Sequence, residues 1–309
     1  MVQSLINNID SVVRGKHDQV RQAVCCLLIE GHLLLDDVPG TGKTTLAKAI
    51  AESVEGTWKR VQFTPDLLPS DITGVMVYEQ PSGTFRFRKG PVFTNVLIGD
   101  EINRGSPKTQ SALLEVMAEH QVTVDGVSHH VPRPFFVIAT ENPRDFHGTF
   151  PLPDVQLDRF AMRISLGYTD HATEVRLLNE HTRHREDLNV APVVDALTLE
   201  KVIDAVDEVE ASPGVTDYIV RIAEATRNHP DLRLGVSTRG TITLLRAAKA
   251  WAATVERDFV SPDDVQDVVP AVCAHRMALT PEAALRGERT ERVIESVLDS
   301  VPVPRTREG

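Results

Sequence analysis

The chain has 309 residues and a formal net charge of −11 at pH 7, from 33 Lys and Arg against 44 Asp and Glu. Apolar residues make up 41% and charged residues 25%, an ordinary globular composition that excludes a wholly disordered chain. The acidic balance disfavours non-specific nucleic-acid binding through a broad basic surface.

No segment has the features of a membrane span or a secretion signal. The longest apolar run near the N-terminus, residues 23–29, is shorter than the roughly 18 residues that a membrane helix needs. The three cysteines, Cys25, Cys26 and Cys273, lack metal-ligand spacing. We therefore expect small buried thiols in a reducing cytoplasm, rather than a zinc site or a disulfide framework.

Strand and helix patterns alternate over the first half of the chain. After a short lead, Val20, Val24 and Leu27 recur at helical spacing and predict a helix that ends near Gly31. Another helical pattern begins at Lys43. Strands alternating with helices indicate a parallel α/β sheet. The predicted strands are three buried segments, 33–35, 96–98 and 135–139, and an exposed edge strand at 162–166.

Two short hairpins interrupt this alternation. Residues 75–78 and 84–87 flank a turn-rich link at 79–83. Residues 121–124 and 127–130 flank Asp125-Gly126, a dipeptide that strongly favours a two-residue hairpin turn.

Strand patterns fade after about residue 167, and the rest of the chain is predicted to be helical. A helix start is indicated by Ser261, Pro262 and Asp264, which supply an N-cap, a first-position proline and an acid three residues after the cap. We therefore predict an α/β domain over residues 1–168 and a helical domain over 169–309 that ends in a short tail. One predicted apolar helix stripe contains Ile242, Leu245, Ala248, Ala252 and Val255.

A phosphate-binding loop is predicted between the first strand and the helix that begins at Lys43. Its glycines let backbone N–H groups close around an anion, and the helix N-terminus adds partial positive charge. Lys43 can reach the β- and γ-phosphates, and the Thr44 hydroxyl can hold Mg²⁺. The usual pattern has glycine where this chain has Asp37, which either fits the turn as it is or lowers nucleotide affinity. The loop is Pro39-Gly40-Thr41-Gly42-Lys43-Thr44.

Two acids follow the strand at 96–98. Asp100 is predicted to hold the Mg²⁺ shell, and Glu101 to orient and polarise the attacking water. An exposed helix cap would explain such a pair alone equally well, but the phosphate loop earlier in the chain favours the catalytic interpretation.

A polar residue also follows the strand at 135–139. Asn142 stands where an amide can hydrogen-bond both a water and the γ-phosphate, although a plain Asn-Pro turn explains Asn142-Pro143 as well.

Together these residues resemble the AAA+ ATPases, and specifically the MoxR family. The resemblance extends from about Val13 to Leu279. It rests on segments that include the phosphate loop, Asp100-Glu101-Ile102-Asn103-Arg104 and Gln156-Leu157-Asp158-Arg159-Phe160. The other matching segments are 31–35, 62–74, 107–115 and 135–140.

The resemblance implies a P-loop NTPase core with a parallel five-stranded sheet and two β-hairpin inserts, followed by an all-α lid domain. It places Asn142 at the sensor-1 position and Arg159 at the arginine-finger position, which acts on the neighbouring subunit's nucleotide. Arg239 matches sensor 2, and Val13 and Gly15 lie where the N-terminal linker touches the adenine. The residues expected to bind ATP are Val13, Gly15, Pro39, Gly40, Thr41, Gly42, Lys43, Thr44, Thr45 and Asp100, with Thr44 and Asp100 also holding Mg²⁺.

The same resemblance implies a homo-oligomeric ring, expected to be a hexamer, that hydrolyses Mg-ATP to remodel, mature or chaperone a partner. The implied partner is a von Willebrand factor A-domain protein, with a metalloenzyme or enzyme complex as client. Two alternatives are also compatible with the sequence. One is a DNA-acting motor, against which the net charge argues; the other is a nucleotide-gated binding module with little turnover, for which Asp37 is the sequence support.

Overall fold

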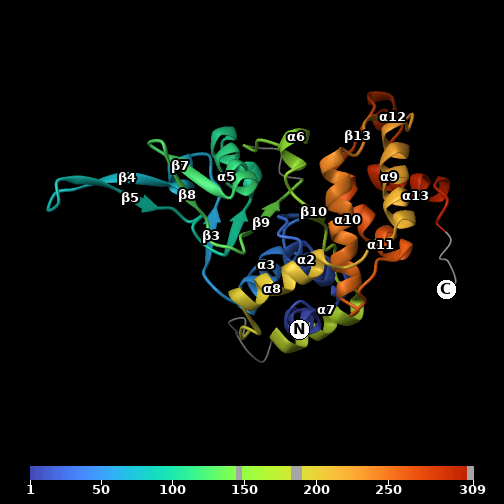
Figure 1. Cartoon of the computed structure of the whole chain (residues 1–309), viewed down its shortest axis with the longest axis horizontal. Coiled ribbons are helices and arrows are strands. Elements are labelled where there is room, and N and C mark those ends of the chain that lie inside the picture. The colour runs from blue at the N-terminus through green and yellow to red at the C-terminus, as the bar shows by residue number, and fades with distance from the viewer. Residues whose placement is uncertain (144–147, 182–189, 305–309) are drawn as a thin grey trace.

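A five-stranded parallel sheet forms the centre of the N-terminal half in the computed structural model, which describes residues 1–143, 148–181 and 190–304 (Figure 1). The strand order is β10-β1-β9-β6-β3, and every neighbouring pair is parallel. The P-loop core that the resemblance implies is thereby confirmed. The strands are β10 (Met162–Ile164), β1 (Leu33–Asp36), β9 (Phe136–Glu141), β6 (Val96–Asp100) and β3 (Trp58–Gln62).

Both faces of the sheet are buried, which explains the continuously apolar strands. In β1, Leu33 and Leu35 join one apolar cluster and Leu34 joins the other. Three helices cover the first face: α1 (Val2–Asp10), α2 (His17–Leu28) and α3 (Lys43–Ser53). The second face is covered by α4 (Pro69–Thr73) and α5 (Pro107–Glu119).

Two elements of this core were not predicted. The expected short lead is the helix α1, which buries Leu5, Ile6 and Ile9 against α2 and α3. The fifth strand, β3, is an edge strand in which only Val61 is buried. A single buried residue gives no apolar run, so this strand has no sequence signature of its own.

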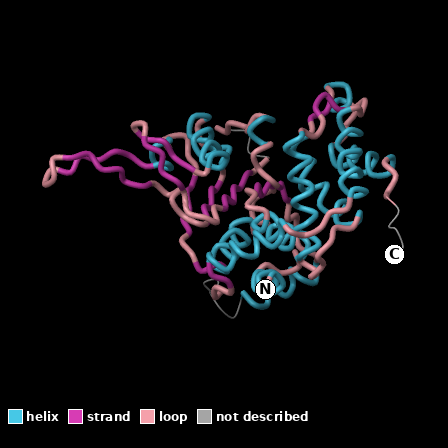
Figure 2. Tube along the Cα trace, in the orientation of Figure 1, coloured by secondary structure: helices cyan, strands magenta, loops and turns pink. Residues whose placement is uncertain are grey.

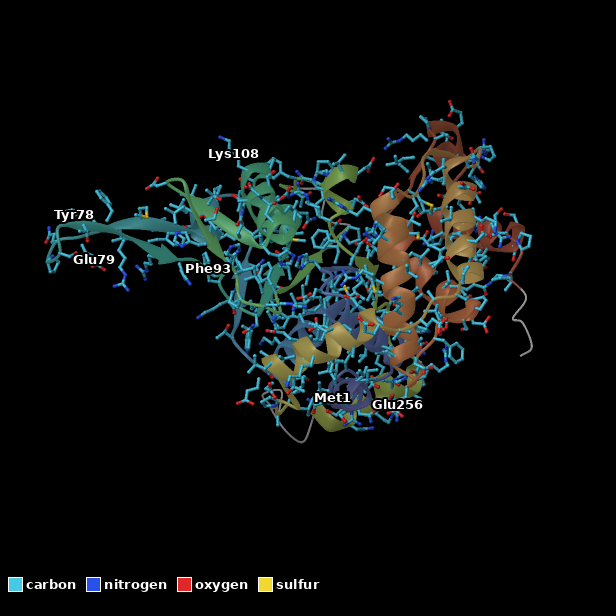
Figure 3. All side chains as sticks on the ribbon, in the orientation of Figure 1. Met1, Tyr78, Glu79, Phe93, Lys108 and Glu256 are labelled. Carbon is cyan, nitrogen blue, oxygen red and sulfur yellow. The ribbon has the colours of Figure 1, made fainter. Side chains whose placement is uncertain are left out.

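Both predicted hairpins are present. The first pairs β4 (Gly74–Glu79) with β5 (Thr84–Lys89) and projects far from the core, with Tyr78 and Glu79 near its end (Figures 1 and 3). The second pairs β7 (Gln121–Val124) with β8 (Val127–His130). Asp125 and Gly126 both have positive φ, as a type I′ turn requires.

The part of the chain after residue 168 is helical, as expected, and the helices pack beside the sheet (Figure 2). The all-α description needs one correction. Short strands also occur there: β11 (Val194–Asp195) pairs in parallel with β2 (Val54–Glu55) of the N-terminal half, and β12 (Leu232–Leu234) pairs with β13 (Ala278–Leu279). The helices are α7 (His171–His181), α8 (Ala196–Asp207), α9 (Pro213–Arg227), α10 (Thr238–Ala253), α11 (Pro262–Cys273), α12 (Pro281–Leu285) and α13 (Thr290–Ser300).

The predicted start of α11 is confirmed, and the predicted stripe on α10 is partly wrong. Ser261 and Asp264 form a capping box, each accepting a hydrogen bond from the other's backbone N–H. On α10, however, Ile242 is exposed and Val255 lies beyond the end of the helix, because the buried face is centred on Leu244 and Trp251 instead.

The predicted burial of the cysteines is confirmed: Cys25, Cys26 and Cys273 are buried free thiols. Burial raises the pKa of Cys25 and of Cys273 to about 12. None of the helices in the described residues is long and apolar enough to cross a membrane. The predicted C-terminal tail falls on residues 305–309, outside the described residues.

Candidate functional site

The phosphate loop joins β1 to the N-terminus of α3. Gly40 and Gly42 have φ of 84° and 93°, a left-handed conformation that side chains other than glycine rarely adopt. α3 begins at Lys43, so its free N–H groups face the loop. The Lys43 ammonium donates to the carbonyl of Asp37 and, at 2.9 Å, to that of Val38. The loop therefore holds the Lys43 ammonium with its own carbonyl groups.

Asp37 is compatible with the turn and does not require a glycine conformation, because its φ is not positive. Its carboxylate accepts from the N–H of Val38 at 2.7 Å and from that of Gly167 at 2.5 Å. Burial opposes ionisation, but these hydrogen bonds outweigh it and hold the pKa of Asp37 below its usual range. The side chain lines a different cavity from the one that the loop encloses, and its hydrogen bonds connect the loop to Gly167, which follows β10.

A cavity of about 420 Å³ brings together the loop, both acids and Asn142. Val13 and Gly15 do not line it: Val13 is buried in the apolar cluster, and Gly15 lies against Thr173. Thr41 also stays outside the lining, with its hydroxyl donating to the Val38 carbonyl at 3.2 Å. The lining residues are Pro39, Gly40, Gly42, Lys43, Thr44, Thr45, Arg60, Gln62, Asp100, Glu101, Thr140, Glu141 and Asn142.

The donors in this cavity suit a magnesium ion. The Thr44 hydroxyl and the Asp100 carboxylate are the hard oxygen ligands that Mg²⁺ prefers. Asp100 is buried at the end of β6, and its Oδ2 lies 2.5 Å from Nε of Arg60. Its Oδ1 accepts from the Thr140 hydroxyl at 3.3 Å. A cation therefore already balances this carboxylate, as a metal ion would.

Glu101 is fixed by three neighbours. Its φ is 55°, and its N–H donates to the Thr140 hydroxyl at 3.0 Å. Its carboxylate oxygen Oε2 accepts from Gln62 Nε2 at 3.0 Å and lies 3.0 Å from Nε of Arg104. These contacts hold the Glu101 carboxylate in the lining of the cavity.

Sequence reasoning missed Arg60 and Gln62, both on β3. The available signal is their spacing: residues two apart on a strand point to the same face, and here that face carries two polar side chains beside the two acids. The missed strand and the missed residues share one cause, because an edge strand with a polar face lacks an apolar pattern.

A pair of carboxylates lies at the ends of β1 and β9. Asp36 on β1 is opposite Glu141 on β9 in the sheet register, and Asp36 lies 3.6 Å from Arg163. Burial, and then the nearby charge of Asp36, raise the pKa of Glu141 to about 7. Glu141 Oε2 and Asp36 Oδ1 are buried and have no hydrogen-bond partner in the described structure.

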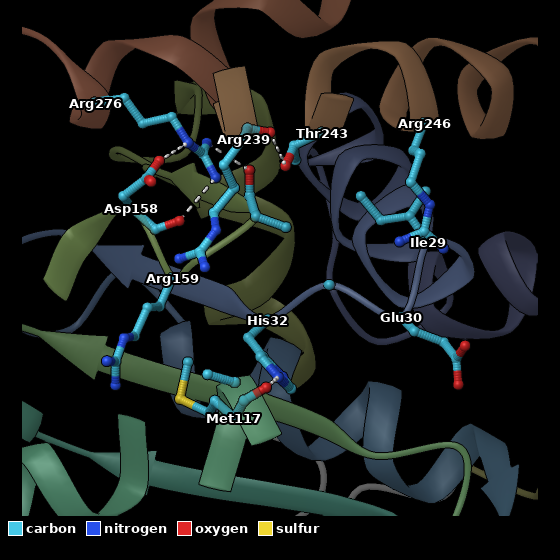
Figure 4. A pocket seen from close by; sticks show the side chains of 13 residues that line it. Ile29, Glu30, His32, Met117, Asp158, Arg159, Arg239, Thr243, Arg246 and Arg276 are labelled. Carbon is cyan, nitrogen blue, oxygen red and sulfur yellow. Dashed lines mark hydrogen bonds and ion pairs between the residues drawn. The ribbon is translucent and has the colours of Figure 1, made fainter. Parts of the chain in front are cut away.

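Arg159 and Arg239 lie elsewhere, in a pocket of about 200 Å³ that shares no lining residue with the first cavity (Figure 4). Arg159 follows α6 (Asp154–Leu157), and Arg239 lies in the first turn of α10. Neither guanidinium has a hydrogen-bond or ion-pair partner among the residues that the structure describes. Sequence reasoning found both arginines by resemblance but did not predict that they would share a pocket.

Comparisons with known proteins agree with this arrangement. A model of the ATPase family associated with various cellular activities matches residues 32–162, and a model of the AAA lid domain matches residues 224–297. The chaperone MoxR1 of Mycobacterium tuberculosis is 36% identical over 98% of this chain and 82% of its own length. The protein MoxR of Methylorubrum extorquens is 30% identical over 96% of this chain and 93% of its own. The chain belongs to the MoxR family of AAA+ ATPases.

The MoxR fold extends over nearly the whole chain. A crystal structure of a protein from Cytophaga hutchinsonii, provisionally assigned as an ATPase, superimposes with a TM-score of 0.90 at 36% identity, covering 98% of this chain and 95% of that one. The uncharacterised protein YeaC of Bacillus subtilis is 44% identical over 97% of this chain and 93% of its own. The family match includes the phosphate loop, the two acids and Arg159, and the lid match includes Arg239.

Proposed function

We propose that this MoxR-family chain hydrolyses Mg-ATP at the interfaces of a homo-oligomeric ring, expected to be a hexamer, and uses the cycle to remodel a partner protein. One observation carries this proposal: the phosphate loop with its acids, and the two partner-free arginines, lie in separate cavities of one chain. A complete site would then need two chains.

The first cavity supplies the groups that hold and attack the nucleotide. The loop N–H groups and Lys43 bind the phosphates, and Thr44 and Asp100 would hold Mg²⁺. When bound, Mg²⁺ supplies charge neutralisation on the β- and γ-phosphates. Glu101 takes the proton of the attacking water, and Asn142 orients that water. The proposed contact of Val13 and Gly15 with the adenine rests only on the family resemblance.

The second pocket supplies charge to a neighbour. Phosphoryl transfer depends mainly on positioning and on stabilising charge around the γ-phosphate. Arg159 and Arg239 present cationic groups that no residue of the described part of their own chain neutralises. Placed against the first cavity of the next subunit, both would act in trans, so hydrolysis would depend on assembly.

The partner is proposed from family likeness. The similar proteins include one named a chaperone, which supports a remodelling or maturation role. A von Willebrand factor A-domain protein and a metalloenzyme client remain part of this proposal. So does a cytoplasmic location, which is supported by three free thiols of the kind that a reducing compartment keeps reduced.

A DNA-acting motor is a second candidate because of the projecting β4–β5 hairpin. Arg86 and Arg88 lie on one side of it, and the rings of Tyr78 and Phe85 pair 5.3 Å apart on the other. DNA-stimulated hydrolysis that weakens as salt rises would favour this candidate. The third possibility is a module that binds nucleotide with little turnover; Asp37, its sequence support, does not line the cavity that contains Lys43 and the loop glycines.

The proposal is tested by Mg-ATP hydrolysis measured against protein concentration. We expect specific activity to rise with concentration in the wild type and to collapse in Arg159→Ala. The matched control is Arg221→Ala, which removes an arginine on α9 that pairs with Asp217 and lines neither cavity. Activity independent of both concentration and Arg159 would show self-contained sites and overturn the ring proposal.

A further inference from the structure

The segment that carries Arg159 is bound on two sides by the lid of the same chain. Asp158, its immediate neighbour, accepts a hydrogen bond from Arg276 Nε at 2.7 Å. The Ser237 hydroxyl lies 3.3 Å from Oδ2 of the same carboxylate. Ser237 and Arg276 come from different parts of the lid, before α10 and after α11, so a single aspartate joins both to the core.

Arg276 also holds the main chain on either side of Arg159. Its side chain is 2% exposed. Its Nη2 donates to the Phe160 carbonyl at 2.7 Å and to the Asp158 carbonyl at 3.3 Å, and its Nη1 donates to the Ala161 carbonyl at 3.0 Å. A planar guanidinium with several donors fixes orientation as well as distance. The backbone of Arg159 is therefore positioned by one lid residue.

The same guanidinium packs against the turn that carries Arg239. A Cβ placed on Gly240 would come within 2.9 Å of Cδ of Arg276, so glycine lets the side chain lie directly on the first turn of α10. Ser237 is the N-cap of that helix and accepts from the Gly240 N–H at 3.1 Å. Arg239 therefore lies in the sequence between Ser237, which contacts Asp158, and Gly240, which lies against Arg276.

We propose that Asp158 is a positioning residue for hydrolysis in the neighbouring subunit, and that its contacts with Arg276 and Ser237 join Arg159 and Arg239 into one rigid unit. A movement of the lid then carries both guanidinium groups toward or away from the neighbour's nucleotide together. This inference rests on the proposed function, because it assumes that the two arginines act in trans.

Figure 4 shows the Asp158–Arg276 contact beside Arg159 and Arg239, in the pocket that all four residues line. Asp158 itself pairs with Arg276, so its charge does not reach the neighbour's phosphates as a free group. Its effect is instead on the direction in which Arg159 points. A displacement of about 1 Å at a reacting centre can lower a rate by about a hundredfold.

The test is subunit mixing with Asp158→Asn. When this variant is measured without a second protein, we expect it to keep its affinity for a fluorescent ADP analogue while its turnover falls about tenfold or more. Mixed one to one with Lys43→Ala, whose own nucleotide site is inactive but whose arginines are intact, it should recover hydrolysis well above the sum of the two separate variants. No recovery would place the effect of Asp158 in its own chain and overturn the inference.

A control mixture separates this inference from the function on which it rests. Arg159→Ala mixed with Lys43→Ala should recover hydrolysis in the same way. Recovery there, without recovery for Asp158→Asn, refutes the inference and leaves the trans site standing. Failure of both mixtures refutes the trans site and the inference with it.

A milder pair of variants covers the case in which Asp158→Asn unfolds, since it leaves Arg276 without its carboxylate. Ser237→Gly removes the hydroxyl contact with Asp158, and glycine is accepted at helix N-caps. Ser237→Thr keeps a hydroxyl. We expect turnover to fall about threefold or more in Ser237→Gly and to stay near wild type in Ser237→Thr, with equal nucleotide affinities. Equal turnover in both variants would contradict the inference.

Discussion

Arg60 on the edge strand β3 pairs with Asp100 at the end of β6, with Nε of the guanidinium 2.5 Å from Oδ2 of the carboxylate. The carboxylate is 4% exposed and the guanidinium 44%, so the arginine can leave while the aspartate stays in place. Asp100 is also the proposed Mg²⁺ ligand. The arginine and the metal ion therefore compete for one carboxylate.

Removing this competitor should lower the magnesium requirement. We expect Arg60→Met to bind a fluorescent ADP analogue at a Mg²⁺ concentration about fivefold lower than wild type, since about 1 kcal/mol is a reasonable size for a partly exposed ion pair. Lys59→Met, at the exposed neighbouring position on the opposite strand face, is the matched control. A higher Mg²⁺ requirement in Arg60→Met would show that the guanidinium instead supports the nucleotide.

Glu101→Gln should separate binding from hydrolysis. The amide keeps the size of the side chain and an oxygen that can accept from Gln62, but it cannot take a proton from water. We expect turnover to fall by about 10²–10⁴ while the affinity for ATP stays within about twofold. The measurement pairs phosphate release with equilibrium nucleotide binding. Unchanged turnover would remove Glu101 from its proposed role.

Sequence patterns predicted the buried part of the fold better than its edges. The strand at Leu33–Leu35 and the hairpin turn at Asp125-Gly126 were found because burial on both faces and positive φ restrict residue choice. β3 was missed because an edge strand with one buried residue has no apolar pattern. The helix α1 was missed because its few buried residues fall within a short polar segment.

The candidate site likewise contains residues that local motifs predict and contacts that they do not. Lys43 and Asp100 follow from local motifs, because a phosphate loop and a strand-end acid are each contiguous in sequence. The pairing of Asp100 with Arg60 and the contact of Asp158 with Arg276 join residues 40 and 118 positions apart. Such contacts depend on strand order and on lid placement, which no local pattern contains.

Asp37 provides a test of the hydrogen bonds that connect the phosphate loop to the segment after β10. In Asp37→Gly the acceptor for the Val38 and Gly167 N–H groups is lost, so we expect the free energy of unfolding to fall by about 1–3 kcal/mol. Nucleotide affinity should not rise, because the side chain does not line the cavity that contains Lys43 and the loop glycines. Urea unfolding and ADP-analogue binding measure the two effects.

Asp37→Asn is the matched control for that experiment. It keeps an oxygen acceptor and should lose less stability than Asp37→Gly. An increase of nucleotide affinity in the glycine variant would contradict the structural role and show that Asp37 weakens nucleotide binding.

Glu141 predicts a pH dependence of stability. Its pKa is raised to about 7 by burial and by the charge of Asp36, so the folded chain binds a proton that the unfolded chain releases between about pH 4.5 and 7. Stability from this group is therefore present at low pH and is lost as pH rises through that window. Arg163, which faces the same pair, opposes the shift but does not cancel it.

Glu141→Gln should remove this dependence, because the amide imitates the protonated carboxyl. We expect the variant to match wild type near pH 4.5 and to exceed it by about 3 kcal/mol in the free energy of unfolding at pH 8, since the pKa rises from 4.5 to about 7 and one pKa unit corresponds to about 1.4 kcal/mol. Urea unfolding of the nucleotide-free protein at each pH measures this difference. Glu295→Gln, at an exposed position on α13, is the control, and its difference from wild type in the free energy of unfolding should not grow with pH. A gap that stays constant from pH 4.5 to 8 in Glu141→Gln would mean that Glu141 is already ionised throughout, with Arg163 balancing both carboxylates.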